Sequence, residues 1–441
     1  MPETYTRSDC RYCHSRRLTK FLSLGQHPPS DAFIDAREIP SEQRYPLEVW
    51  VCEDCFLVQL VDVVSREVLF GDYAYLASQS KALRRHYEAL ARSLAERFAP
   101  PPREDSESPS AAARASGGGA PLASNLDVLA VDIGCNDGVL LAGYAGTNVK
   151  PVGVEPSNVA EVSRAAGYDV EHRFFDMDCA HAIIARRGRA RIVTATNVFP
   201  HVDDIGAFTD AVAALLDDDG VFVIEASYLV DVIDQTLFDT IYHEHLCYPA
   251  LTPVAPFLRR HGLEVFDAER VDFGASGPAI RIFAQRVVPG GAARPIGPAV
   301  DRMLADESAW GIRSLDRYRD YGRQVERLRT ELTALLASLK SQGARLGGYG
   351  APAKGSTLLN YLNLPEGTIE SIAETNVRKI GKVTPGSHIP VVSEDDFMRN
   401  PPEYALLLAW NYLQFFLDHS DYIKRGGRFV VPIPAPRIVP A

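Results

Sequence analysis

Two Cys-x-x-Cys pairs near the start of the chain constrain its fold more than any other feature. Cys10 and Cys13 form the first pair, and Cys52 and Cys55 form the second. In a reducing compartment, cysteines at this spacing bind metal more often than they form disulfides, and four thiolates suit a tetrahedral Zn²⁺ ion. Because cysteine would fill all four positions, none is left for water, which indicates a structural zinc site. Buried free thiols, a redox-active pair, or His14 in place of one cysteine are the alternatives.

The length and charge of the chain limit the kinds of partner that it can have. Its 441 residues are enough for two or three domains, each with its own core. A net charge of −11 argues against a general affinity for nucleic acid or anionic membranes, which an acidic surface repels. No apolar run approaches the roughly 20 residues of a membrane span, and the chain start lacks the apolar stretch of a secretion signal. We therefore expect a cytoplasmic protein, a monomer or homodimer, that binds a small molecule.

The first part of the chain divides into a small domain and a linker. Residues 1–75 hold the cysteine pairs and an extended, aromatic-rich run over 45–51. Residues 76–125 begin with an amphipathic helix over 80–98, because apolar side chains recur there at helical spacing. The rest of this linker, 100–124, is rich in Pro, Ser, Ala and Gly, so no apolar face can be drawn through it. This composition predicts a disordered or mobile loop.

The remainder of the chain alternates short apolar strands with helices, which predicts an α/β fold. Within a central domain over 126–290, buried-type strands alternate with helical segments, which favours a mostly parallel sheet wound on both faces. The predicted strands of this domain are Val128–Ile133, Lys150–Glu155, Arg191–Thr196 and Gly220–Glu225. A third domain over 298–441 is predicted to be smaller and Rossmann-like. Its predicted elements are a long helix over 309–342, a strand over 345–349, a helix over 351–361 and a strand over 404–410.

The turn after the first central strand indicates a cofactor site. Glycines in Asp132–Gly138 allow the backbone to approach a ligand, and Glu155 at the end of the next strand can accept hydrogen bonds from ribose hydroxyls. The turn has Gly-x-x-x-Gly with an acidic residue inside it, which suits a cationic sulfonium and would repel a pyrophosphate. We therefore predict S-adenosylmethionine, with NAD or a purely structural turn as alternatives. The predicted cofactor-binding residues are Asp132, Gly134, Asn136, Asp137, Glu155 and Asn197.

The densest run of titratable side chains is Phe238–His245, which follows the last predicted strand of the central sheet. Open α/β sheets bind ligands at this carboxyl edge. Burial of Tyr242-His-Glu-His245 as core would require a hydrogen-bonding partner for each polar group, which favours a site over a core role. A solvated loop with chance polar residues is the alternative.

Taken together, these motifs resemble the S-adenosylmethionine-dependent sugar C-methyltransferases of actinomycete deoxysugar pathways, which methylate carbon 3 or carbon 5 of dTDP-4-keto sugars. The resemblance covers almost the whole chain except 100–124. The motifs that carry it, besides the cysteine pairs, are Asp132–Gly138, Phe238–His245, Gly348–Gly355 and Thr384–Pro390. It implies a zinc-binding N-terminal domain, a doubly wound class I methyltransferase domain, and a Rossmann-like C-terminal domain that helps to enclose the nucleotide sugar. It also implies a role in natural-product biosynthesis, including that of antibiotics.

The resemblance also implies roles for single residues. Tyr242, Glu244 and His245 would be catalytic, with His245 favoured as the base that removes a proton beside the ketone. Lys354, in the glycine-rich turn, could supply charge near the diphosphate, although a tight turn without a ligand is the alternative reading. The predicted substrate-binding residues are Tyr75, His201, His243 and Lys354.

The chain departs from the family pattern on the substrate side. The family usually has a His-Gly-Gly-Ser-x-Arg run where this chain has Phe273–Arg281, and Cys247, Pro249 and 374–380 also differ. These changes leave methyl transfer as the expected reaction and open the identity of the substrate. A keto-sugar epimerase or dehydratase, a C-methyltransferase of a non-sugar ketone, and a zinc-containing scaffold are the competing hypotheses.

Overall fold

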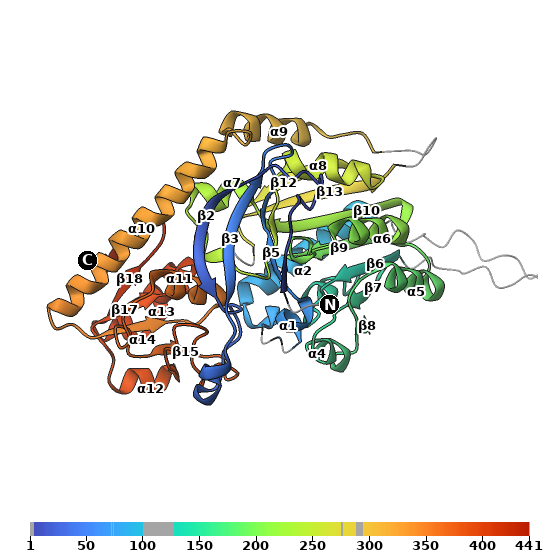
Figure 1. The fold of residues 1–441 in the computed structure, drawn as a ribbon. Helices are drawn as coiled ribbons and strands as arrows, with labels where there is room; N and C mark the ends of the chain where they lie inside the picture. Colours follow the sequence, from blue (N-terminus) through green and yellow to red (C-terminus); the bar gives the residue numbers. More distant parts are fainter. Residues whose placement is uncertain are drawn as a thin grey trace, which may run out of the picture.

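The computed structural model describes residues 4–71, 73, 75–99, 128–274, 277–287 and 294–440. Four sheets organise these residues: a two-stranded and a four-stranded sheet in the N-terminal region, a large central sheet and a C-terminal sheet (Figure 1). The loop predicted over 100–124 lies outside the described residues. None of the described helices is both long and apolar enough to cross a membrane.

The N-terminal sheet is antiparallel and takes its last strand from a distant part of the chain. Its order is β11-β4-β3-β2, and β11 pairs with β4 directly after the predicted catalytic run. Alternate residues of β3 point inward, which buries Leu47, Val49 and Val51. The strands here are β2 (Leu18–His27), β3 (Tyr45–Cys52), β4 (Val58–Leu60) and β11 (Cys247–Tyr248), with β1 (Thr4–Thr6) paired to β5 (Asp62–Val64) beside them. Helices α1 (Arg66–Phe70), η1 (Ala36–Ser41) and η2 (Ala77–Gln79) complete this region.

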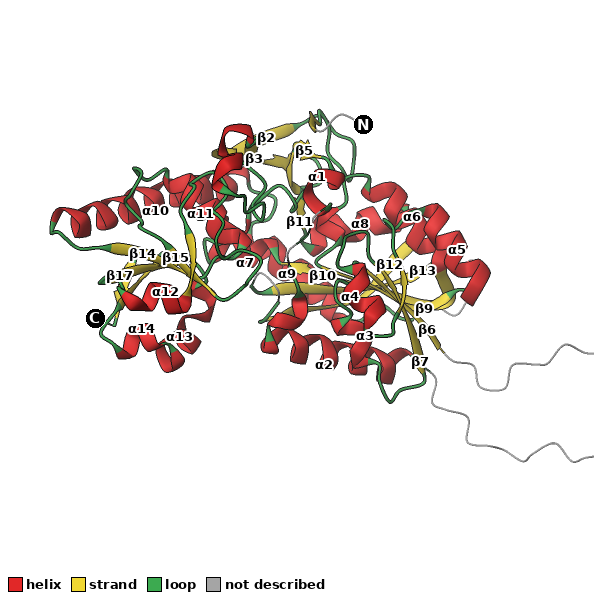
Figure 2. Cartoon of the chain, turned by 90° about the horizontal axis from the view of Figure 1, so that it is seen from below, coloured by secondary structure: helices red, strands yellow, loops and turns green. Residues whose placement is uncertain are grey.

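Helix α2 (Lys81–Phe98) confirms the predicted amphipathic helix and covers one face of the central sheet. Ser80 caps it by accepting a hydrogen bond from the Leu83 N–H at 3.3 Å. The helix crosses α3 closely at Gly143, where a Cβ would lie 2.7 Å from that of Ala91. Figure 2 shows α2 and α3 on one side of the sheet and α5 and α6 on the other.

The central sheet has seven strands in the order β12-β13-β10-β9-β6-β7-β8, in which β13 runs antiparallel to both of its neighbours and all other pairs are parallel. The chain runs outward from β6 to β8 and then returns to β9, so the strand order reverses between β6 and β9, where open α/β sheets bind ligands. This topology confirms the doubly wound methyltransferase fold. The strands are β6 (Val128–Ile133), β7 (Val149–Val154), β8 (Asp169–Glu171), β9 (Ala190–Thr196), β10 (Leu216–Ser227), β12 (Leu263–Val271) and β13 (Ala279–Arg286). The helices are α3 (Val139–Gly143), α4 (Ala160–Ala165), α5 (Met177–Arg187), α6 (Ile205–Leu215), α7 (Leu229–Asp234), α8 (Leu251–Arg260), η4 (Phe199–His201) and η5 (Phe238–Thr240).

The C-terminal sheet has six strands in the order β16-β15-β14-β17-β18-β19 and is parallel except for β19. Its strand order also reverses at one point, between β14 and β17, as in Rossmann-like folds. The strands are β14 (Leu346–Tyr349), β15 (Ile372–Glu374), β16 (Val391–Ser393), β17 (Tyr404–Leu407), β18 (Arg428–Val431) and β19 (Arg437–Val439). The helices are α11 (Ala353–Leu362), α12 (Glu394–Arg399), α13 (Leu413–His419), α14 (Asp421–Lys424) and η6 (Trp410–Tyr412).

The long helix predicted over 309–342 is confirmed as α10, but its predicted start is wrong, because residues 309 and 310 end a separate helix. Helix α9 (Pro298–Trp310) ends at Gly311, whose φ of 92° supplies the left-handed cap that stops a helix. Helix α10 (Leu315–Ser341) then runs along the N-terminal sheet towards the C-terminal domain (Figure 1). At Gly322 it approaches β2 so closely that a Cβ would lie 2.3 Å from the Phe21 carbonyl oxygen. Helix α10 therefore connects the two outer domains.

Candidate functional site

A cavity of about 2290 Å³ lies at the carboxyl edge of the central sheet and extends to the C-terminal domain. Segments of all three domains line it, including the turn after β6, the loop before β11 and the turn before α11. Most of the predicted site residues reach this one cavity. They are Tyr75, Asp132, Gly134, Asn136, Glu155, Asn197, His201, Tyr242, Glu244, His245 and Lys354.

The turn after β6 is held in a shape that only glycine allows. Gly134 has a φ of 72°, and a Cβ there would lie 2.3 Å from Cγ2 of Val198. The Glu155 carboxylate at the end of β7 accepts hydrogen bonds from the backbone N–H of Asn136 at 2.9 Å and of Ser157 at 3.0 Å. The carboxylate is thereby fixed beside the turn, at the edge of the cavity.

Two further polar groups stand at the ends of neighbouring strands. Burial raises the pKa of Asp132 to about 7, and Thr194 donates a hydrogen bond to its Oδ1 at 2.6 Å. Asn197 follows β9 with a φ of 56° and donates from Nδ2 to the Tyr87 hydroxyl at 3.0 Å. A buried acid whose pKa lies near neutrality favours a cationic ligand, because a positive charge would stabilise the carboxylate.

Asp137, which was predicted to bind the cofactor, is not among the residues that line the cavity. Its Oδ2 accepts a hydrogen bond from the Ser78 N–H at 3.1 Å. Asn136 holds the same segment, because its Oδ1 accepts from the Ala77 N–H at 2.9 Å and its Nδ2 donates to the Tyr75 carbonyl at 3.1 Å. Asp137 and Asn136 therefore fix the segment that carries Tyr75 against the cofactor turn.

The segment between β8 and α5 also lines the cavity, although it was missing from the predicted site. Phe174, Phe175, Asp176 and Met177 all contribute to the wall. Strand β8 has three residues, too few for a recognisable strand pattern. The sequence signal that could have located this segment is Asp176, a residue type that favours the N-cap of a helix. Asp176 caps α5 by accepting a hydrogen bond from the Cys179 N–H at 2.8 Å.

The hydrogen bond of His245 fixes its tautomer. Its Nδ1 lies 2.7 Å from the Thr240 carbonyl oxygen, which can only accept, so Nδ1 carries the proton. Nε2 is therefore unprotonated and can accept a proton. Burial lowers the pKa of His245 to about 4, so the ring is neutral at physiological pH.

The neighbours of His245 form a compact group. His201 stacks on its ring with centroids 5.1 Å apart, and the Tyr242 ring lies 4.0 Å away. Burial raises the pKa of Glu244 to about 7, and Ser30 donates to its Oε2 at 3.4 Å. Near neutral pH, Glu244 can therefore act either as a hydrogen-bond donor or as an acceptor.

His243 does not line this cavity, although it was predicted to bind substrate. Its Nε2 lies 3.2 Å from the Pro46 carbonyl oxygen, and its ring meets Tyr45 edge-on. Residues 242–245 form a turn, closed by a hydrogen bond from the His245 N–H to the Tyr242 carbonyl at 2.9 Å, and this turn directs His243 to the other side. His243 therefore packs against β3, whereas Tyr242 and Glu244 line the cavity.

Lys354 lies in the first turn of α11, after Gly350, whose φ is 76°. Its Nζ is buried, lies 4.2 Å from the Trp410 ring centroid and has no hydrogen-bond acceptor among the described residues. Burial lowers its pKa. An ammonium group without a hydrogen-bond acceptor is costly to bury, and an anionic ligand would compensate it.

The four predicted metal ligands form one cluster. Their sulfur atoms lie within 4.8 Å of one another, with Cys10 and Cys55 at 3.4 Å and Cys13 and Cys52 at 3.5 Å. Zinc–thiolate bonds of about 2.3 Å in a tetrahedron place sulfurs about 3.8 Å apart, so the cluster fits Zn²⁺. His14 lies outside the cluster, because its Nδ1 faces Asp9 at 3.1 Å.

The comparison with known proteins agrees with this arrangement. C-methyltransferase NovU of Streptomyces niveus is 34% identical over 436 residues, which cover 98% of this chain and 97% of NovU. The chain belongs to this C-methyltransferase family. Ubiquinone biosynthesis O-methyltransferase of Rhodopseudomonas palustris (strain HaA2) is 33% identical over 95 residues, which cover 21% of this chain and 38% of that protein.

Three family descriptions match consecutive parts of this C-methyltransferase. Residues 10–70 match "Putative zinc binding domain", 83–268 match "Methyltransferase domain", and 275–434 match "C-methyltransferase C-terminal domain". With the four-cysteine cluster and the sheet topology, these matches confirm a methyltransferase that uses S-adenosylmethionine and has a zinc-binding N-terminal region.

Distant structural matches also fall among methyltransferases. Magnesium protoporphyrin IX methyltransferase (ChlM) from Synechocystis, with bound SAH, is 12% identical, covers 49% of this chain and 90% of that chain, and has a TM-score of 0.33. A S-adenosylmethionine-dependent methyltransferase from Clostridium acetobutylicum is 15% identical, covers 36% of this chain and 85% of that chain, and has a TM-score of 0.29. Similarity this distant says nothing about the substrate of this C-methyltransferase.

Proposed function

We propose that this C-methyltransferase acts on the carbon beside the ketone of a dTDP-linked keto-deoxysugar. The observation that carries the proposal is the position of His245. Its unprotonated nitrogen belongs to a ring that lines the same cavity as the acidic cofactor turn and the buried ammonium of Lys354. A base that shares one cavity with a site suited to a cation and a site suited to an anion is suited to proton abstraction from a sugar that carries a diphosphate.

The cofactor would be held by the turn after β6. Asp132 is suited to the ammonium of the amino-acid part, and Glu155 is suited to the ribose hydroxyls. Gly134 and Asn136 allow close approach of the backbone, and Asn197 faces the same side of the cavity. When bound, S-adenosylmethionine supplies an electrophilic methyl group.

The nucleotide sugar would be held by the opposite wall. Lys354 is a desolvated cation without a hydrogen-bond acceptor, and a diphosphate would supply acceptor oxygens. Tyr75 and His201 line the same cavity. In this arrangement the sugar ring would lie against His245.

The chemical step assigned to the protein is enolisation. Nε2 of His245 takes the proton from the carbon beside the ketone, so a C–H bond breaks and an N–H bond forms. The electron pair moves onto the ketone oxygen, which Glu244 in its protonated form, or the Tyr242 hydroxyl, can stabilise by a hydrogen bond. The Thr240 carbonyl keeps the ring in the tautomer that can accept the proton.

A panel assay tests the proposal. The enzyme is incubated with methyl-¹³C-labelled S-adenosylmethionine and a set of dTDP-4-keto sugars, with simple ketones as a second set. We expect one sugar to gain a methyl group whose NMR signal shows attachment to carbon. A methyl group on oxygen, transfer only to the simple ketones, or sugar epimerisation without methyl gain would contradict the proposal.

A further inference from the structure

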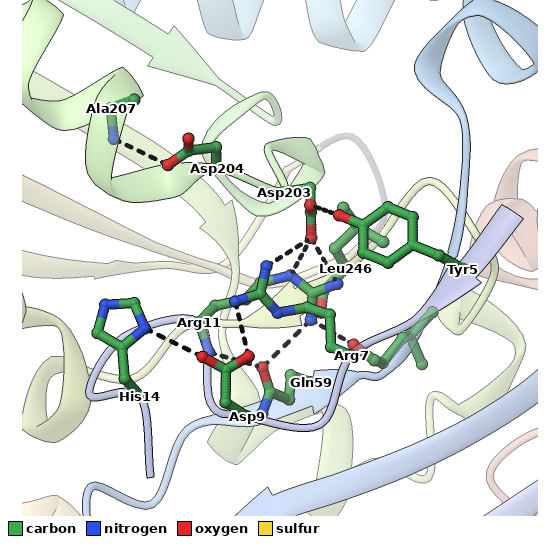
Figure 3. A network of polar contacts seen from close by, with 11 residues as sticks. Tyr5, Arg7, Asp9, Arg11, His14, Gln59, Asp203, Asp204, Ala207 and Leu246 are labelled. Carbon is green, nitrogen blue, oxygen red and sulfur yellow. Dashed lines mark hydrogen bonds and ion pairs between the residues drawn. The ribbon is translucent and has the colours of Figure 1, made fainter. Parts of the chain in front are cut away.

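Arg11 lies between the first two zinc ligands, yet its side chain points into the protein and not to solvent. The residue is 2% exposed. Its Nη1 lies within hydrogen-bond distance of three acceptors, which are the Leu60 carbonyl, Gln59 Oε1 at 3.2 Å and the Leu246 carbonyl at 3.4 Å. Its Nε donates to Asp203 Oδ1 at 3.1 Å, and Figure 3 shows this contact within a larger polar network.

Two of these acceptors lie within two residues of the cavity histidines in sequence. Leu246 follows His245, and Asp203 lies two residues after His201. The Leu246 peptide is itself shared between domains, because its N–H donates to the Pro200 carbonyl and its carbonyl accepts from the Leu60 N–H, both at 2.9 Å. Arg11 therefore contacts both segments that carry the stacked histidines.

The Asp203 carboxylate also accepts hydrogen bonds from two residues other than Arg11. Arg7 Nη1 donates to Asp203 Oδ1 at 3.3 Å, and the Tyr5 hydroxyl donates to Oδ2 (Figure 3). Both donors come from the strand and turn that precede the first zinc ligand. A lysine at position 11 could not reproduce the contacts of Arg11, because a guanidinium reaches several acceptors in one plane and an ammonium does not.

We propose that Arg11 is a positioning residue that holds His245 and His201 in register through the Leu246 carbonyl and the Asp203 carboxylate. The zinc-binding turn thereby fixes the geometry of the base as well as the fold of the N-terminal domain. The proposal rests on the proposed function only for the role of His245 as base.

The test uses the full-length protein labelled with ¹⁵N-histidine, with His245 and His201 signals assigned by their loss in His245→Asn and His201→Asn. In the parent protein, His245 should show the Nδ1–H tautomer. Arg11→Gln and Arg11→Lys should each convert this signal into a mixture of tautomers. Arg17→Gln is the matched control, because Arg17 lies in the same domain but pairs on the surface with Glu53 and Asp54, and it should leave the spectrum unchanged.

A kinetic measurement complements the spectrum. If the keto-sugar assay gives turnover, Arg11→Gln should lower kcat by on the order of 100-fold, as misplacement of a reacting group by about 1 Å can do. The KM for S-adenosylmethionine should stay within about twofold, because Arg11 does not touch the cofactor turn. Loss of cofactor affinity in parallel with kcat would indicate a general structural defect and overturn the proposal.

The NMR spectrum needs no substrate, so it tests the role of Arg11 even if no keto sugar reacts. If no keto sugar reacts, the proposed function fails and the proposal for Arg11 is still decided by the spectrum. An unchanged His245 signal in a folded, zinc-containing Arg11→Gln protein overturns the positioning role. If that variant loses zinc or fails to fold, Asp203→Asn decides, because it leaves the zinc-binding turn intact. An altered His245 signal in Asp203→Asn supports the proposal, and an unchanged one overturns it.

Discussion

The methyltransferase domain and the C-terminal domain share one arrangement, in which a glutamate at the end of one strand accepts a hydrogen bond from the turn that follows the neighbouring strand. In the first, the turn after β6 has its Asn136 N–H bound at 2.9 Å by Glu155, at the end of β7. In the second, the turn after β14 has its Ala351 N–H bound at 2.6 Å by Glu374, at the end of β15. Both turns open on the same cavity.

The charges around the two turns differ in sign. The first has the buried acid Asp132 at the end of β6, whereas the second has the buried ammonium of Lys354 in the first turn of α11. A parallel strand followed by a glycine turn and a helix can therefore serve a cation or an anion, and the nearby side chains decide which. His245 lines the same cavity as both turns.

The largest expected effect is that of replacing His245, which belongs to neither of the two turns. His245→Asn should lower turnover by on the order of 10²–10⁴-fold, because the proton acceptor is lost. Affinity for S-adenosylhomocysteine, measured by calorimetry, should stay at the parent value. Glu244→Gln should lose less turnover, and Tyr242→Phe less again if a second donor shares the enolate oxygen. A His245→Asn enzyme that keeps more than about a tenth of parent turnover would move the base elsewhere, to His201.

The next-largest effect distinguishes the turn after β6 from the turn after β14 by their affinity for the cofactor. Glu155→Ala should weaken binding of S-adenosylhomocysteine by on the order of 100-fold, because a hydrogen bond to a charged group contributes about 1.5–3 kcal/mol. Glu374→Ala is the matched control, since it removes the same backbone contact from the other turn. Equal weakening in both variants would show that the two turns are not specialised.

Lys354→Met should show the opposite selectivity. We expect affinity for dTDP to fall about tenfold, because one charge-assisted contact is lost, with no change in affinity for S-adenosylhomocysteine. Lys340→Met, on the exposed face of α10, should change neither property. If Lys354→Met binds dTDP as tightly as the parent protein, Lys354 does not bind the diphosphate.

The smallest effect is a pH dependence specific to the acidic turn. The pKa of Asp132 is raised to about 7, so the carboxyl must lose its proton before it can pair with the ammonium of the cofactor. Affinity for S-adenosylhomocysteine should therefore rise between about pH 6 and pH 8 and level off above it, with protons released on binding. Asp132→Asn should flatten this rise. A pH-independent affinity in the parent protein would contradict the assignment of Asp132.

The sequence was most informative where a local pattern determines the structure. Helix α2 and the strands that flank the cofactor turn follow from spacing of apolar residues, and the four cysteines from their pairing. Contacts between distant segments left no such pattern: β11 joins the zinc-binding sheet from nearly 190 residues further along the chain. The end of α9 depends on the backbone angle of Gly311, and the direction of His243 depends on packing against β3.

Proton loss from the carbon that receives the methyl group is the central claim, and one isotope measurement tests it most directly. A keto sugar that gains methyl in the panel assay is prepared with deuterium at the carbon that receives the methyl group. The product is examined by mass spectrometry for methyl gain and deuterium content. The account predicts that every methylated molecule has lost the deuterium from that carbon, since the C–D bond must break before the new C–C bond forms. Methylated product that retains the deuterium would contradict it.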